Sequence, residues 1–225
     1  PMADELSESQ QKQAYEAIRA GIIHATYRPG VRLPMKRLTE ELDLGRTPIR
    51  EALVRLTQEG LVYSVPHSGT YVSPIDLHAA ESARYVRKNL ETAVAVECCS
   101  QGGDEILASL GEVLERQRVA AASRDAQAFY TCDGCFYRRL FEAVGKEEVW
   151  LWIDGLSVSL DRVRWLSMLT EKFDWDAVVA QHDAVRDAIE ARDASEVCRL
   201  ETQYLNGLLA YLDVVRERFP EYFAE

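Results

Sequence analysis

Several features are missing from this 225-residue chain, and each absence narrows its class. It has no apolar run of membrane-spanning length, and its first residues do not form a secretory signal pattern. The five cysteines are an odd set that falls within helical patterns, which indicates reduced thiols instead of a disulfide framework. We therefore expect a cytoplasmic protein that has no membrane partner.

Positive charge is also scarce, because the formal net charge is -11. Residues 1–73 hold nine basic and nine acidic side chains, whereas residues 74–225 hold seventeen basic and twenty-eight acidic ones. Between Arg28 and Arg55 the balance reverses, with seven basic residues against four acidic ones. Exposed charges are screened over about 10 Å, so a phosphate senses only this local field. The first third of the chain can therefore bind nucleic acid, and the remainder is expected to bind something else.

Two short amphipathic helices are predicted between Leu33 and Val72. The first covers Met35–Leu42, and the second begins with Thr47 as its N-cap and Pro48 at its first helical position. Apolar residues then recur at helical spacing, which leaves the basic side chains at the exposed start of the second helix. This is the pattern of a helix-turn-helix, whose second helix presents its N-terminal residues to the major groove of DNA.

A β-hairpin is predicted directly after these two helices. Residues 62–65 and 70–72 are rich in β-forming side chains, and the turn between them contains Gly69, which is free to adopt a positive φ. A first helix that begins near Ser7 precedes the pair. Together these elements predict a winged helix-turn-helix domain over residues 7–73.

The motifs of this domain resemble those of the GntR family of bacterial transcription regulators. The matching pieces are RPGVRLP (28–34), GRTPIREAL (45–53), EGLV (59–62) and SGTYV (68–72), in this order along the chain. The forked N–H donors of Arg46 and Arg50 suit contact with guanine or phosphate. Thr47 and His67 have purely structural alternatives, Thr47 as the helix cap and His67 as a turn residue. With the resemblance, the DNA-binding residues are expected to be Lys36, Arg46, Thr47, Arg50, His67 and Gly69.

The rest of the chain is predicted to be helical. Helices are expected near residues 76–100, 105–122, 124–144, 147–168, 174–192 and 194–218. Short connections favour an antiparallel bundle of six or seven helices over residues 76–220. The expected fold class is therefore mainly α, with an N-terminal winged domain and a C-terminal all-helical bundle.

This second part resembles the effector domain called FCD, found in the FadR-type subgroup of the same family. The matching pieces are YVRKNLE (85–91), CDGCFYRRLFEAVGK (132–146) and QHDAVRDAIEARDASEV (181–197). The resemblance implies that the bundle binds a small effector and supports a homodimer.

Many FCD domains bind a divalent metal through one Asp and three His side chains. The corresponding positions here are Asp133, Tyr137, His182 and Tyr204, so that two imidazoles are replaced by phenols, which are poor metal ligands at neutral pH. No metal cofactor is therefore favoured, and any metal would depend on Asp133 and His182. We expect these four residues to bind the effector instead, with Arg87 as the clamp for its carboxylate. The tyrosines could alternatively be core residues.

These patterns predict a ligand-responsive transcription regulator, a homodimer on double-stranded DNA that acts as a repressor released by a small organic or sugar acid. A metal-dependent sensor that uses Asp133 and His182 is the alternative. A helical enzyme is disfavoured, because the sequence offers no paired carboxylates, no nucleophile with a partnered base and no phosphate-binding loop.

Overall fold

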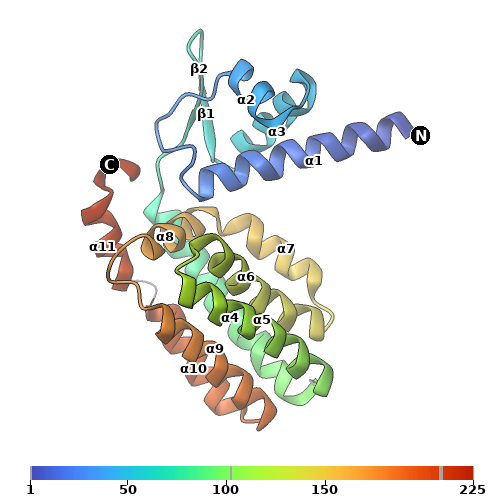
Figure 1. Cartoon of the computed structure of the whole chain (residues 1–225), viewed down its shortest axis with the longest axis vertical. Helices are drawn as coiled ribbons and strands as arrows, with labels where there is room; N and C mark the ends of the chain where they lie inside the picture. The colour runs from blue at the N-terminus through green and yellow to red at the C-terminus, as the bar shows by residue number, and fades with distance from the viewer. Residues whose placement is uncertain (1, 102, 208–209, 225) are drawn as a thin grey trace. The chain divides into compact units, whose positions relative to one another are not determined.

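The computed structural model describes residues 2–101, 103–207 and 210–224 (Figure 1). Within these ranges it has eleven α-helices, one two-stranded sheet and a short 3-10 helix. The chain divides into two compact units, residues 1–77 together with 219–225, and residues 78–218. The expected mainly α fold, with a winged helix-turn-helix ahead of an all-helical region, is confirmed.

The first unit contains three helices and a hairpin: α1 (Met2–Ile23), α2 (Met35–Leu42), α3 (Arg46–Gln58), β1 (Val62–Val65) and β2 (Gly69–Val72). Helix α3 buries Ile49, Ala52, Leu53 and Leu56, and it packs mainly on α1. This apolar stripe at helical spacing fixes which face of α3 points inward. The opposite face, which carries the basic residues, is left in solvent.

Two helix starts differ from the sequence prediction. Helix α1 begins at Met2 instead of Ser7, and α3 begins at Arg46, so Thr47 is not a cap. Gly45 holds the N-cap position in an extended conformation and makes no side-chain capping bond. Pro48 is therefore the third helical residue, where its missing N–H still costs no intrahelical hydrogen bond because the first four N–H groups have no partner.

A tyrosine–glutamate–arginine cluster ties α1 to the end of α3. The Tyr15 hydroxyl lies 2.9 and 2.8 Å from the two carboxylate oxygens of Glu59, and Arg55 lies over the Tyr15 ring. Burial and the bond to Glu59 raise the pKa of Tyr15 to about 12, so the phenol keeps its proton and donates. A cluster of the same composition anchors α2 to the segment after α1 through Tyr27, Glu41 and Arg37.

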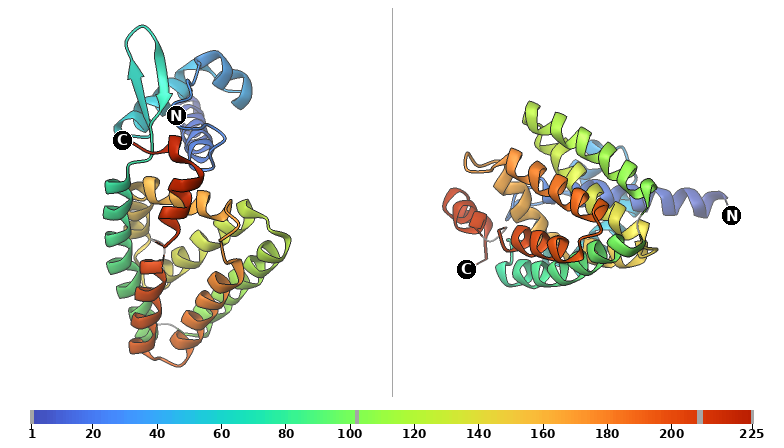
Figure 2. Two further views of the ribbon diagram at one scale, coloured as in Figure 1. Left: turned by 90° about the vertical axis from the view of Figure 1, so that its left-hand side faces the viewer. Right: turned by 90° about the horizontal axis from the view of Figure 1, so that it is seen from below.

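The wing is an antiparallel hairpin in which β1 pairs with β2 (Figure 2, left). Its turn needs positive φ at two residues, His67 (60°) and Gly69 (135°), whereas only the glycine was expected to adopt it. A side chain at position 69 would also place a Cβ atom 2.8 Å from Nε of Arg32. Gly69 is thus needed for its backbone conformation, and the Arg32 side chain would have to shift to admit a Cβ atom there.

The second unit has eight helices in its described residues. They are α4 (Leu77–Gln101), α5 (Asp104–Ser123), α6 (Ala126–Ala143), α7 (Glu147–Leu156), α8 (Val158–Met168), α9 (Trp175–Glu190), α10 (Ala194–Gly207) and α11 (Ala210–Arg218). The predicted helix 147–168 is divided at Ser157, whose hydroxyl donates to the carbonyl of Ile153 and competes with the regular helical bonds. The predicted helix 194–218 is likewise described as α10 and α11.

The core of this unit is formed by residues of α4, α5, α6, α7, α9 and α10 (Figure 2, right). Helix α6 contributes Phe136, Leu140 and Phe141, all fully buried. All five cysteines are free thiols, as the sequence indicated.

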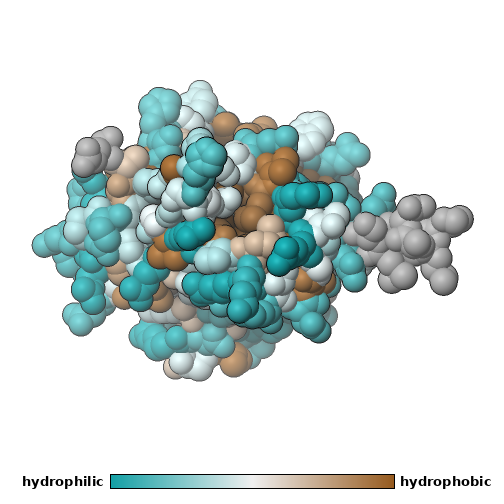
Figure 3. All heavy atoms as spheres, turned by 90° about the horizontal axis from the view of Figure 1, so that it is seen from above, coloured by the Kyte–Doolittle hydropathy of each residue, from teal (hydrophilic) through white to brown (hydrophobic). Residues whose placement is uncertain are grey.

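The drawn face of the molecule is mainly hydrophilic, with apolar side chains in a few small groups (Figure 3). Among the described residues, no helix is both long enough and apolar enough to span a bilayer.

Candidate functional site

The first turn of α3 presents three polar side chains to solvent. Arg46, Thr47 and Arg50 are exposed, because the apolar stripe of α3 faces α1. Neither Arg46 nor Arg50 forms an ion pair with another described residue, whereas Arg37 and Arg55 are paired with glutamates. The two guanidinium groups at the helix start are therefore free to bind phosphate or the edge of a guanine.

The other predicted DNA contacts lie on the neighbouring elements. Lys36 is exposed in the first turn of α2 and lies 3.8 Å from Glu40, a distance too long for a hydrogen bond. His67 is exposed at the wing tip, and Gly69 supports the wing turn from a half-buried position. The structure thus places a lysine and two arginines at the starts of the two motif helices, where the helix dipoles also attract phosphate.

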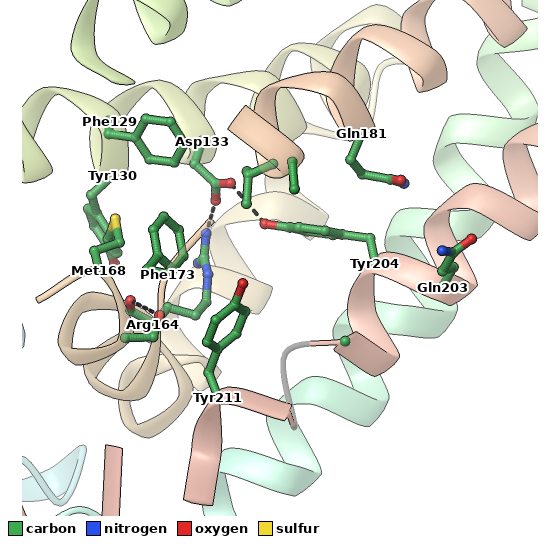
Figure 4. Close-up of a pocket in the computed structure, with 14 residues that line it drawn as sticks. Phe129, Tyr130, Asp133, Arg164, Met168, Phe173, Gln181, Gln203, Tyr204 and Tyr211 are labelled. Carbon is green, nitrogen blue, oxygen red and sulfur yellow. Dashed lines mark hydrogen bonds and ion pairs between the residues drawn. The ribbon is translucent and has the colours of Figure 1, made fainter. Parts of the chain in front are cut away.

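A cavity of about 360 Å³ opens in the helical unit (Figure 4). It is lined by residues from α6, α8, α9, α10 and α11, and by the segment between α8 and α9. Its polar lining residues are Asp133, Arg164, Ser167, Gln181 and Gln203, and its aromatic ones are Phe129, Tyr130, Phe173, Tyr204 and Tyr211. A pocket of this size and character is typical of small-molecule sites.

An ion pair between Asp133 and Arg164 lies at the centre of the pocket wall (Figure 4). One oxygen of Asp133 pairs with Nη2 of Arg164, and the other accepts a hydrogen bond of 3.0 Å from the Tyr204 hydroxyl. Nη1 of Arg164 donates to Asp161 at 2.8 Å. The guanidinium has five N–H donors, and these two bonds use two of them.

His182 lies fully buried behind this pair. Its Nδ1 is 2.9 Å from the amide oxygen of Gln117, which can only accept, so Nδ1 carries the proton. Nε2 then has a lone pair that no described residue satisfies, 3.6 Å from Asp133 Oδ1. Burial and the nearby charge of Arg164 lower the pKa of His182 to about 3, so the ring is neutral.

The structure brings only part of the predicted effector set to the cavity. Asp133 and Tyr204 line it, whereas His182, Tyr137 and Arg87 do not. Tyr137 is fully buried, and its hydroxyl donates to Glu201 at 3.1 Å.

Arg87 is engaged elsewhere, since its Nε lies 2.5 Å from a Glu91 oxygen and its Nη1 lies 3.3 Å from Asp161. Arg164 is the arginine that reaches the pocket. No motif marks Arg164 in the sequence. The available signal is that α8 carries three charges, Asp161, Arg162 and Arg164, although nearly all its residues are buried.

The donors at the FCD metal position do not fit a divalent cation. Burial raises the pKa of Tyr204 to about 12 and that of Tyr137 well above its ordinary value, so both phenols stay neutral. Asp133 already holds the positive charge of Arg164, which would repel a second cation beside it. This leaves the imidazole of His182 and a neutralised carboxylate, too few ligands for a tight site.

A second polar group, Glu201 with Glu91, is buried within the helical unit. Glu201 on α10 and Glu91 on α4 are fully buried, and each has one carboxyl oxygen without a hydrogen-bond partner in the described chain. Burial and the charge of Glu91 raise the pKa of Glu201 to about 8. Glu201 is therefore mostly protonated at neutral pH.

Two family matches cover most of the chain. Residues 10–72 match the gntR family of bacterial regulatory proteins, and residues 84–207 match the FCD domain. The HTH-type transcriptional repressor RspR of Escherichia coli K12 is 28% identical over 218 residues, which cover 95% of this chain and 93% of that protein. The gluconate operon transcriptional repressor of Bacillus licheniformis is 26% identical over 180 residues, covering 78% and 74%.

Two solved structures share the fold. Escherichia coli McbR/YncC superposes with a TM-score of 0.78 over 93% of this chain and 98% of that one, at 19% identity. A GntR protein from Rhodococcus sp. RHA1 superposes with a TM-score of 0.76 over 91% and 98%, at 21% identity. At these identities the likeness concerns the fold alone.

Removing the guanidinium of Arg50 should weaken DNA binding. We expect Arg50→Ala to raise the dissociation constant about tenfold or more, because one bidentate base contact contributes about 1–3 kcal/mol. The measurement is fluorescence anisotropy with a duplex selected from a random library by the wild-type protein. Arg138→Ala, which removes the same charge from an exposed position of the helical unit, is the control. Wild-type affinity in Arg50→Ala would contradict the contact.

The buried acid Glu201 should make stability depend on pH. Its carboxyl group binds its proton more tightly in the folded chain (pKa about 8) than at its ordinary value of 4.5, so folding loses stability as pH rises between these values. Glu201→Gln removes this loss and can still accept from Tyr137. The unfolding free energy of the variant minus that of wild type should grow by about 1.4 kcal/mol per pH unit.

Urea unfolding at pH 5.5, 6.5 and 7.5 measures this difference between variant and wild type. A difference that stays constant over the three pH values would show that Glu201 does not bind a proton in this range.

Proposed function

The chain belongs to the gntR family of bacterial regulatory proteins with an FCD domain and is a DNA-binding transcriptional regulator, and on this basis we propose that it is a repressor released by a small organic or sugar acid bound in the helical unit. Its family and its relatives are regulators, not enzymes. Repressors are found among these relatives. The proposal therefore concerns the direction of the response, the effector and the assembly.

The position of Arg164 carries the proposal of an acidic effector. This arginine lines the cavity, is held by two aspartates and uses two of its five N–H donors in those pairs. A guanidinium with a fixed orientation suits a carboxylate, because its planar fork matches the two carboxylate oxygens. Arg164 thus takes the clamp role that the sequence suggested for Arg87.

The relatives support an acid of this kind. One of them is named for the gluconate operon, and gluconate is a sugar acid. For release, the acid must bind more tightly to the DNA-free conformation, since a ligand with equal affinity for both conformations shifts nothing.

The effector is proposed to bind without a metal ion. The neutral phenols and the Asp133–Arg164 pair support this part of the proposal. The alternative is a metal sensor, and the single observation in its favour is the lone pair of His182 Nε2 near Asp133.

Thermal unfolding with a panel of carboxylates, each tested with Zn²⁺ and with EDTA, separates these functions. A ligand that binds only the folded state at one hundred times its dissociation constant stabilises by about 2.7 kcal/mol, so micromolar binders are visible. We expect an acid to raise the melting temperature equally in EDTA and to dissociate the protein from its selected duplex. Stabilisation that disappears in EDTA would mean that Asp133 and His182 do bind a metal.

We also propose a homodimer, because one winged domain reads only a short half-site and two-fold symmetry supplies affinity. An exposed apolar stripe on α7 supports this assembly. Leu151, Trp152 and Leu156 are each 65% exposed, and Gly155 is exposed between them. Their spacing places them along one side of the helix, where an isolated protein would carry polar residues. A second copy of the same stripe is the proposed partner.

A charge in this stripe should separate the subunits. We expect Trp152→Glu to run as a monomer in size-exclusion chromatography with light scattering and to bind the selected duplex about tenfold more weakly, because two half-sites no longer act together. Val119→Glu, at an apolar residue on α5 that is 62% exposed, is the matched control and should remain a dimer. A Trp152→Glu protein that stays dimeric would exclude this stripe as the interface.

A further inference from the structure

The pocket is unusually rich in aromatic rings for a site that binds a sugar acid. Phe129, Tyr130, Phe173, Tyr204 and Tyr211 all line it. Three of them form a continuous wall, since the Phe173 ring packs edge-on against Phe129 at 6.0 Å and lies 5.5 Å from the Tyr211 ring. Tyr204 approaches the same space from α10 (Figure 4). Aromatic walls of this kind favour a flat, apolar ligand body.

Most polar groups of the pocket already have partners inside the protein. The Tyr204 hydroxyl donates to Asp133, the Ser167 hydroxyl donates to a backbone carbonyl at 2.7 Å, and the Gln181 amide donates to the carbonyl of Leu200 at 2.8 Å. A polyhydroxylated acid would bury several hydroxyl groups that find few partners here, and each unsatisfied one weakens binding.

Among the polar lining residues, Arg164 is the one with a positively charged group. Its guanidinium also lies 5.5 Å from the centre of the Tyr130 ring, so the charged group adjoins the aromatic surface. The cavity of about 360 Å³ exceeds the volume of about 150 Å³ that encloses one benzene molecule in an apolar core. There is room for one ring, a short linker and a carboxylate.

From this combination we infer that the effector is an aromatic carboxylic acid, with its ring against Phe173 and Tyr211 and its carboxylate on Arg164. The inference rests on the proposed function, in which an acid bound in this cavity releases the repressor. It narrows the class of acid from any small carboxylate to an aryl-alkanoic or benzoic type.

Isothermal titration of the full chain with 3-phenylpropionate, 3-phenylpropionamide and gluconate tests the ligand class. The acid is expected to bind, and the amide should bind about tenfold more weakly or worse, because it cannot form a charged pair with Arg164. Gluconate should bind more weakly than the aromatic acid. The same preparations are tested for release from the selected duplex.

Two variants at one position test the aromatic wall without disturbing the buried ion pairs. Tyr211→Leu should weaken binding of 3-phenylpropionate about fivefold, because it removes ring contact, whereas Tyr211→Phe keeps the ring and should bind within about twofold of wild type.

A third variant tests the carboxylate contact. Arg164→Lys, which keeps the positive charge but loses the planar fork, should weaken binding of the acid and leave binding of the amide unchanged. Melting curves check that each variant is folded.

The outcomes separate the inference from the proposed function. Tighter binding of gluconate than of the aromatic acid, with release from the duplex, would overturn the aromatic class and keep the proposed function. Equal binding in Tyr211→Leu and Tyr211→Phe would also overturn it. If no acid binds or releases the duplex, both fail.

Discussion

A chain of buried charges, Glu91–Arg87–Asp161–Arg164–Asp133, links α4, α8 and α6 in the helical unit. Each group loses its hydration on folding, so the chain adds little net stability compared with an apolar core. The effect of the chain is to fix the positions of its side chains. Removing Arg87 or Arg164 would leave Glu91 or Asp133 without its ion-pair partner in a dry interior, which costs several kcal/mol. The orientation of Arg164 in the pocket is a consequence of this arrangement.

This chain also underlies the proposal that an acid binds without a metal ion. The two tyrosines at the positions that correspond to metal ligands in the FCD resemblance are neutral. The guanidinium of Arg164, which Asp133 and Asp161 hold from two sides, is the proposed partner of the carboxylate through its unused N–H donors.

The two arginines in the first turn of α3 are exposed, and those near the cavity of the second unit are buried. This difference explains why the sequence predicted the positions of the first group better than those of the second. Arg46 and Arg50 lie at an exposed helix start whose position follows from a turn and an apolar stripe a few residues long. Even there, the prediction of Thr47 as the cap is wrong, since Gly45 holds the extended cap conformation two residues earlier. In the helical unit, Arg87 matched a family motif but forms its ion pairs away from the cavity, while Arg164 belonged to no motif and lines it.

The sequence by itself determined the winged helix-turn-helix, the helical character of the second unit and the family, because periodicity, turns and short motifs are local properties. The tertiary structure decided which polar side chains share a pocket. Asp133, Arg164, Tyr204 and Tyr211 come from four helices, and no spacing along the chain relates them. Long-range packing also decided that His182 and Tyr137 lie behind the pocket wall, because helix rotation depends on every contact a helix makes. Local patterns specify a helix, but its neighbours specify which of its charged residues meets a ligand.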